Sequence, residues 1–267
     1  MCDVCPTPET GLLPQLTRRR FLQAGVAAAT AALLPGAVGA APGVRPGEAA
    51  TATLINPYTG SIPLVFPVEA GTYRKMWDTW HAQRQGKPQP WSHQNDSSRA
   101  HDGIDINPRS SRSLPPVYAP FAGSVSAVCW RPDNSLSAEV TYAVNSTTPP
   151  PQDYHLATDT AAGLPLYGNF IWLVDSAGYF AFYCHLQNDT ILRALADQLA
   201  RGEHVPVDTN TVVGVMGETG NAVGDPQLHV EIHYPKGNTY SCARCPAGHA
   251  AMTAINPYRS LVDARRR

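Results

Sequence analysis

Gln227-Leu228-His229-Val230-Glu231-Ile232-His233-Tyr234 alternates strictly between polar and apolar side chains. A period of two residues is that of a β-strand, in which successive side chains point to opposite faces of the sheet. The four apolar side chains would share one buried face, and the four polar ones would share the other. A strand of this kind favours a functional surface lined with imidazoles, and the alternative is an ordinary solvated polar face.

A second stretch, His101-Asp102-Gly103-Ile104-Asp105, adds another imidazole and a carboxylate. Two histidines and one acidic residue are a ligand set of catalytic zinc ions, which keep a further coordination position open. On a flat strand His101 and Asp105 would lie about 13 Å apart, too far to share one ion. A turn at Asp102-Gly103 would bring them together. With His229, these two residues are the predicted zinc ligands.

The rest of the chain indicates a turn-rich β protein. It contains 21 glycines and 25 prolines, and its apolar runs are short. Strands are predicted within 123–128, 169–174, 179–186 and 212–234, with a hairpin turn at 175–178. One segment has helical spacing; Asn188 or Asp189 would cap this helix and Gly202 would end it.

The composition limits the size of the protein and its partners. A chain of 267 residues fits one domain with insertions, and a net charge of −1 gives no electrostatic reason to expect nucleic acid as a partner. The predicted organisation is an export signal over 1–40, a leader over 41–61, a catalytic domain over 62–262 with an insertion at 131–166, and a charged tail at 263–267.

The first forty residues have the features of an export signal. Arg18-Arg19-Arg20-Phe21-Leu22 precedes a mild apolar run, and Val38-Gly39-Ala40 offers a small-residue cleavage site. The arginine pair followed by Phe-Leu is typical of the twin-arginine type. The alternative is a membrane anchor, but the apolar run is shorter than the about 20 residues that a span requires. We expect a periplasmic, extracellular or wall-associated protein with no stable membrane insertion after cleavage.

Four cysteines follow the predicted signal. Cys242 and Cys245 are spaced as in redox motifs and zinc ribbons, but a ribbon needs a second such pair, so a local disulfide is favoured over free thiols. Cys129 and Cys184 lie on predicted strands and are either buried thiols or a bridge between strands.

Several blocks in order along the chain resemble the LytM/lysostaphin-type zinc endopeptidases that cut peptidoglycan cross-bridges (peptidase family M23). The similarity runs from about Phe66 to Leu261. The matching blocks are His101-Asp102-Gly103-Ile104-Asp105-Ile106, Val117-Tyr118-Ala119-Pro120, Gly123-Ser124-Val125, Gly168-Asn169, Tyr183-Cys184-His185-Leu186, Gly214 to Gly220, Leu228-His229-Val230-Glu231 and Asn256-Pro257.

The resemblance implies a fold and a set of roles. The fold would be a twisted, mostly antiparallel β-sheet with the metal in a groove, accompanied by long loops and one short helix. His101, Asp105 and His229 would hold Zn²⁺, and His185 would stabilise the attacked carbonyl or help to move protons. Without the family, a lone His185 would be a structural residue. The implied substrate is the peptide of bacterial peptidoglycan, and we expect a monomer.

One catalytic position departs from the family pattern. The closing strand of the family carries His-x-His, and here Gln227 replaces the first histidine. Glutamine forms hydrogen bonds but takes up no proton near neutral pH, and loss of a positioned acid or base typically costs about 10²–10⁴-fold in rate. Shifting the motif so that Glu231 becomes a ligand loses the Leu-His-x-Glu match, so the unshifted alignment is preferred.

Three functions remain open at this stage. The first is an exported zinc metalloendopeptidase that hydrolyses wall peptides. The second is a zinc-binding, catalytically impaired module that binds wall peptide or regulates another hydrolase. The third is a zinc peptidase for a protein outside the wall, with a groove reshaped by the insertion at 131–166.

Overall fold

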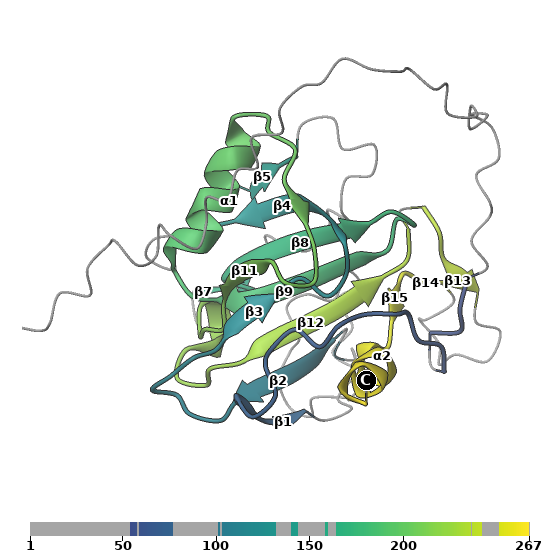
Figure 1. Cartoon of the computed structure of the whole chain (residues 1–267), viewed down its shortest axis with the longest axis horizontal. Coiled ribbons are helices and arrows are strands. Elements are labelled where there is room, and N and C mark those ends of the chain that lie inside the picture. Colours follow the sequence, from purple (N-terminus) through teal and green to yellow (C-terminus); the bar gives the residue numbers. More distant parts are fainter. Residues whose placement is uncertain are drawn as a thin grey trace, which may run out of the picture. The chain divides into compact units, whose positions relative to one another are not determined.

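Antiparallel strands build the centre of the protein. The computed structural model describes residues 54–76 except 58, 101–131 except 102, 140–143, 158–159, 164–241 except 236, and 251–266. Within these residues the main sheet has the strand order β1-β2-β12-β9-β8-β4-β10, with β15 beside β12 and β5 beside β4 (Figure 1). The bounds of these strands are β1 Tyr73–Met76, β2 Ile104–Pro108, β4 Gly123–Cys129, β5 Val140–Tyr142, β8 Asn169–Asp175, β9 Phe180–Leu186, β10 Pro206–Val207, β12 Leu228–His233 and β15 Ala254–Ile255.

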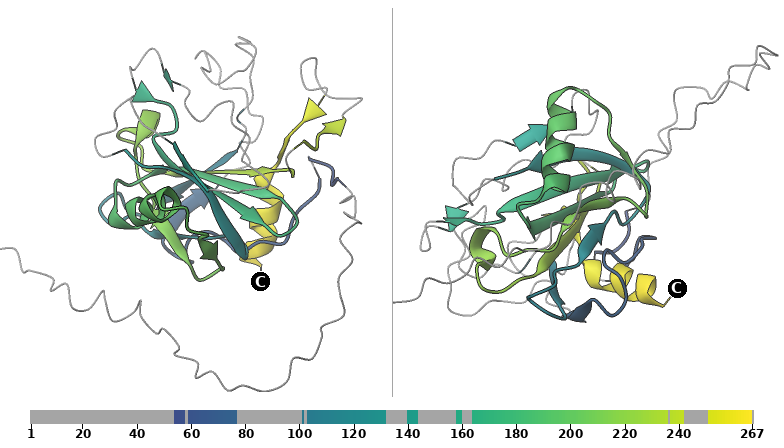
Figure 2. Two further views of the ribbon diagram at one scale, coloured as in Figure 1. Left: turned by 90° about the horizontal axis from the view of Figure 1, so that it is seen from above. Right: turned by 60° about the vertical axis from the view of Figure 1, so that its left-hand side comes forward.

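Short strand pairs and two helices accompany this sheet. Pairs form between β3 (Pro116–Tyr118) and β11 (Val212–Val215), between β6 (Thr158–Asp159) and β7 (Leu164–Pro165), and between β13 (Tyr240–Ser241) and β14 (Ala251–Met252). Helix α1 (Thr190–Ala200) packs against β4, β5 and β11, whereas α2 (Pro257–Arg265) contacts β12 (Figure 2). The predicted mostly β fold with a twisted antiparallel sheet is therefore confirmed.

The local signals explain where the elements begin and end. Of the two candidate caps, Asp189 caps α1 by accepting hydrogen bonds from the backbone N–H groups of Ile191 and Leu192. Gly202 follows that helix with a φ of 76°. In the β8–β9 hairpin, the Asp175 carboxylate accepts two backbone N–H groups, and Gly178 takes a φ of 87° that favours glycine.

The C-terminal helix α2 was not predicted from the sequence. Asn256 caps it, Pro257 occupies its first turn, and Leu261 is buried against the core. The helix runs to Arg265 and thus includes part of the segment predicted as a charged tail. At the other end, Ile55 already packs against the core, within the predicted leader.

Both faces of the central strands carry buried side chains. One face contributes to the larger core, with residues such as Ile106, Tyr183 and Val230. The opposite face packs around Phe170, Trp172 and Phe182 in a second cluster. In the register of β12 with β9, His229 lies opposite Cys184 and Glu231 opposite Phe182, so the polar side of β12 belongs to this second face. A solvated polar face for β12 was one alternative, and it is wrong, because Glu231 is fully buried there.

Some predicted features lie outside the described residues. These are the export signal over 1–40, Cys242, Cys245 and most of the insertion at 131–166. Cys129 and Cys184 are buried free thiols, which decides between the two alternatives for this pair. None of the helices in the described part of the chain combines the length and hydropathy that a membrane crossing requires.

Candidate metal centre

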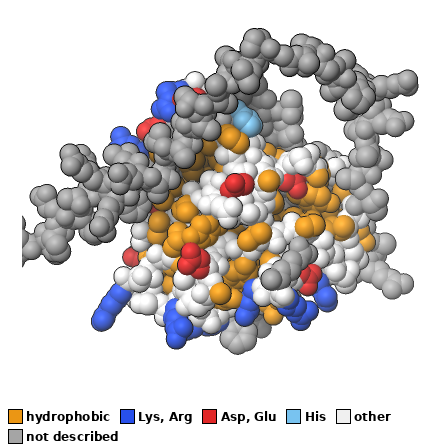
Figure 3. Space-filling view, in the orientation of Figure 1, with side chains coloured by type: hydrophobic (Ala, Val, Ile, Leu, Met, Phe, Trp, Pro, Cys, Tyr) orange, Lys and Arg blue, Asp and Glu red, His pale blue; other side chains and the backbone are white. Residues whose placement is uncertain are grey.

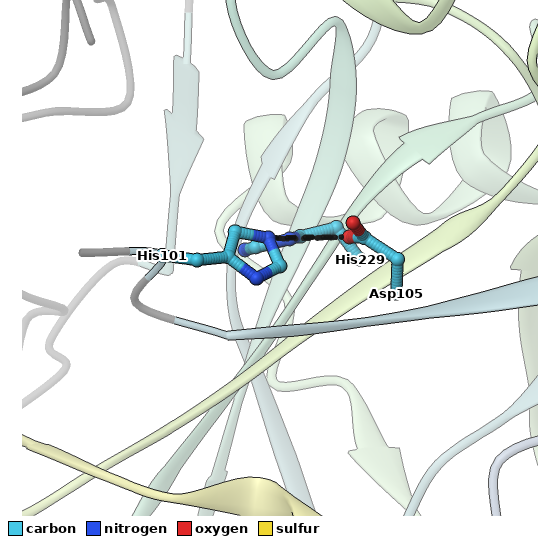
Figure 4. Close-up of side chains that lie close together, drawn as sticks. All are labelled: His101, Asp105 and His229. Carbon is cyan, nitrogen blue, oxygen red and sulfur yellow. Dashed lines mark hydrogen bonds and ion pairs between the residues drawn. The ribbon is translucent and has the colours of Figure 1, made fainter. Parts of the chain in front are cut away.

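Three side chains from two distant parts of the chain converge where β2 pairs with β12. His101 Nε2 lies 3.0 Å from His229 Nδ1 and 3.4 Å from Asp105 Oδ1, and His229 Nδ1 lies 2.9 Å from the same oxygen (Figure 4). Ligands about 2.0–2.1 Å from a tetrahedral zinc ion are separated from one another by about 3.3 Å. The spacing of these three atoms therefore fits the ligand shell of a zinc ion, and their nitrogen and oxygen chemistry suits it.

Strand register and one glycine place the three groups. The register pairs Asp105 of β2 with His229 of β12. The chain bends at Gly103, just before β2, which lets His101 reach the same point. A Cβ at Gly103 would lie 2.3 Å from the Val230 carbonyl oxygen and 2.7 Å from His229 Nε2. Only glycine leaves room there for the His229 ring.

The buried Glu231 carboxylate contacts the side of the His229 ring that faces away from the cluster. His229 Nε2 lies 2.9 Å from Glu231 Oε1, and the other carboxylate oxygen lies 2.6 Å from His233 Nε2. An ionised carboxylate only accepts, so both imidazole nitrogens donate. In the neutral His229 ring this leaves the lone pair on Nδ1, the atom that faces Asp105 and His101. Such carboxylate–histidine pairs orient the histidine ligands of metal sites.

The electrostatics follow from these contacts. Burial raises the pKa of Asp105, but the neighbouring His101 and His229 outweigh burial and hold that pKa well below its usual range. Burial similarly raises the pKa of Glu231, and hydrogen bonds from His229 and His233 bring it well below the ordinary value. For His229, burial lowers the pKa, whereas the two carboxylates raise it to a net value of about 9. A metal ion at Nδ1 would take the place of the proton that these carboxylates stabilise.

A β-bulge places His185 on the same face as His229. Opposite β8, Cys184 pairs with Phe170 and Leu186 with Asn169, so His185 is the extra residue of β9. It has a φ of 61°, in the left-handed region. Without the bulge, His185 would share the opposite face with Tyr183. With it, the ring centre of His185 lies 6.1 Å from that of His229.

The loop around Thr219 and Gly220 holds the His185 ring. His185 Nδ1 donates to the Thr219 carbonyl oxygen at 2.9 Å, which leaves Nε2 as the basic nitrogen of the ring. The Thr219 hydroxyl donates to the Leu186 carbonyl and accepts from the Asn169 N–H. Close by, a Cβ on Gly220 would lie 2.4 Å from the Gly168 nitrogen, so the two backbones touch.

Gln227 lies at the entrance to β12. Its backbone N–H donates to the Gly217 carbonyl at 2.9 Å, its side chain is half-buried, and it precedes His229 by two residues. By strand alternation both side chains belong to the same face. The residue that departs from the family pattern therefore stands beside the metal cluster.

Some supporting residues have roles that the sequence did not predict. Glu231 was considered only as a zinc ligand in a shifted alignment, but its carboxylate contacts the nitrogen of His229 that faces away from the cluster. The alternation along β12 indicates the contact between Glu231 and His233, because it places His229, Glu231 and His233 on one face. Thr219 carried no such signal. His233 lies outside the cluster, as its strand spacing predicts.

No family model matches the sequence. A search of curated proteins likewise found no matching relative.

Among solved structures, the fold is similar to several peptidases. A zinc-containing peptidase from Vibrio cholerae is 17% identical, with 64% of this chain and 37% of that chain covered and a TM-score of 0.37. A candidate glycyl-glycine endopeptidase LytM from Ruminococcus gnavus is 16% identical, with 76% and 60% covered and a TM-score of 0.40. The antimicrobial peptidase lysostaphin from Staphylococcus simulans is 17% identical, with 61% and 45% covered and a TM-score of 0.32.

These similarities are distant. In each of the three cases, this chain covers less than two thirds of the other protein. Two of them bear the names LytM and lysostaphin, after which the resembled family is called.

Proposed function

We propose that this chain is an exported zinc-dependent metalloendopeptidase that hydrolyses peptide bonds of bacterial peptidoglycan. The observation that carries the proposal is the convergence of His101, Asp105 and His229 at separations that suit one zinc ion. The choice of wall peptide as substrate rests on the ordered sequence motifs, and export rests on the arginine pair and small-residue site before residue 41.

The chain's own residues have separable tasks in this proposal. When bound, zinc would supply Lewis acidity and lower the pKa of water. His101, Asp105 and His229 would hold the ion, and Glu231 would keep His229 in the tautomer that ligation needs. His185, with its proton fixed on Nδ1 by the Thr219 carbonyl, would use Nε2 to exchange a proton with the reacting group or, once protonated, to stabilise negative charge on the attacked carbonyl.

Gln227 supports a second candidate function. Its amide orients groups by hydrogen bonding but carries no proton in catalysis. A protein that keeps the metal site and lacks this proton carrier would bind wall peptide, or regulate another hydrolase, with little turnover. The two candidates predict the same zinc content and opposite activities.

Zinc analysis and a digestion assay test the first candidate. We expect about one zinc ion per chain, release of peptide fragments from isolated wall, and loss of both zinc and cleavage in His101→Ala. Zinc-free protein, or cleavage that persists in His101→Ala, would contradict the proposal.

The Gln227→His variant separates the two candidates. If the wild type is a peptidase, it cleaves defined wall peptides without the substitution. If the site is catalytically impaired, wild-type turnover is near background and histidine raises it by about 10²–10⁴-fold. Zinc content is the control in both cases and should not change.

A further inference from the structure

A basic pocket lies beside the metal cluster. It has a volume of about 420 Å³ and is bordered by Arg74 on β1, by Arg109 and Arg112 in the segment after β2, and by Asp225 before β12. Figure 3 shows Lys and Arg side chains gathered along the lower edge of this view, where Figure 1 places β1 and β2. Three cations and one carboxylate give the pocket a surplus of positive charge on a chain whose net charge is −1.

Among the described residues, no protein group neutralises the three guanidinium groups. Within the described part of the chain, neither an ion pair nor a side-chain hydrogen bond engages Arg74, Arg109 or Arg112. The backbone around them is nevertheless anchored, because the Arg109 N–H donates to the Thr72 carbonyl at 2.8 Å and the Arg112 N–H donates to the Ser110 hydroxyl. Guanidinium groups bind carboxylates and other oxyanions well, so the pocket is suited to an anion.

The pocket and the metal cluster share strand β2. Along β2, Asp105 and Asn107 are half-buried and alternate with buried neighbours, so they share the accessible side of the strand. Asp105 belongs to the cluster, and Asn107 lines the pocket. Two residues of strand span about 7 Å, which is also the reach of two residues of an extended peptide.

We infer that this pocket, here named the arginine pocket, binds a carboxylate of the peptide substrate about two residues from the bond held at the metal cluster. The inference rests on the proposed function and adds a substrate class to it, an acidic peptide. The arginine pocket acts on binding and orientation, and its residues lie outside the set that would handle zinc or protons.

A matched pair of peptides tests the inference. One is a synthetic wall stem peptide with free carboxylates, and the other is the same peptide with those carboxylates amidated. Calorimetric titration of the full chain at low salt should show about tenfold tighter binding of the first, which corresponds to about 1.4 kcal/mol. In Arg109→Gln/Arg112→Gln this preference should fall to within about twofold, while binding of the amidated peptide is unchanged.

Two controls make the result specific. Arg193→Gln/Arg201→Gln, with Arg193 on helix α1 and Arg201 just after it, removes the same charge and should keep the preference. Equal binding of both peptides by the wild type, or a preference that survives in the arginine-pocket variant, would overturn the inference. Inorganic phosphate that competes as effectively as the acidic peptide would also overturn it, because the pocket would then be a general oxyanion site.

The same samples separate this inference from the proposed activity. Preferential binding of the acidic peptide without cleavage of either peptide supports the arginine pocket and contradicts the peptidase. Cleavage of both peptides at equal rates, with equal binding, supports the peptidase and contradicts the pocket.

Discussion

At the scale of single residues, Glu231 shows how a buried carboxylate can prepare a metal ligand. Its side chain is fully buried and accepts hydrogen bonds from His229 and His233. A buried charge persists only when it is paired and hydrogen-bonded, and here two imidazoles supply both. The same contact that stabilises the carboxylate sets the tautomer of the ligand.

Replacement of Glu231 should weaken zinc binding in a graded way. Glu231→Gln keeps one acceptor for His229, provided that His233 changes tautomer, so we expect about a tenfold loss of zinc affinity. Glu231→Leu removes both acceptors, so we expect about a hundredfold loss of affinity and a fall of about 3–5 kcal/mol in the free energy of unfolding. Competition with a zinc chelator and urea unfolding measure the two effects. Glu203→Gln, on an exposed segment, is the control; equal affinities in all variants would show that Glu231 has no positioning role.

At the scale of elements, the bulge in β9 and the loop around Gly220 act together. The bulge turns His185 toward the metal face, and the Thr219 carbonyl fixes its ring. The loop packs closely against the segment before β8 because Gly168 and Gly220 lack side chains. With the bulge alone, His185 would lie on the metal face without the Thr219 carbonyl as acceptor. With the loop alone, the carbonyl would be present, but His185 would point to the opposite face.

The Gly220→Ala and Gly224→Ala pair tests the contribution of this loop. Both glycines have left-handed φ angles, 72° and 84°, so both substitutions carry about 1 kcal/mol of backbone cost. Only at Gly220 would the new Cβ meet another backbone, at 2.4 Å, whereas the position of Gly224 is open. We expect peptidase activity to fall at least tenfold further in Gly220→Ala than in Gly224→Ala, with zinc content unchanged in both. Equal activities would mean that the loop does not position His185.

At the scale of the whole molecule, the metal cluster joins segments that are remote in sequence. His101 precedes β2, Asp105 lies within it, and His229 comes from β12 more than 120 residues later. An ion that binds all three is bound by the folded state alone, so it should stabilise the entire domain.

Thermal unfolding should therefore depend on zinc. Zinc at a hundred times its dissociation constant adds about 2.7 kcal/mol to the free energy of unfolding, which for a domain of this size raises Tm by about 5–10 °C. Chelation should reverse the increase, and His101→Ala should show almost no response to zinc. An equal rise in Tm for that variant would place the stabilising zinc at another site.

The sequence by itself determined the type of fold and the identity of the ligand candidates. Alternation along 227–234 predicts β12, the turn residues at 175–178 predict the hairpin, and Asp189 with Gly202 delimits α1. These features depend on neighbours along the chain, which is why local pattern was enough to find them. The second helix, α2, could not be predicted because its apolar pattern is short. Only the packing of Leu261 against the core shows which side of this helix is buried.

Only the tertiary structure decided how the candidates meet. One extra residue in β9 reverses the face on which His185 lies, and no periodicity in the sequence marks it. The roles of Glu231 and Gly103 depend on which atom of His229 each one contacts, and the arginine pocket depends on three separate segments. These relations arise from register and close packing between distant strands, whereas sequence patterns report on the local chain.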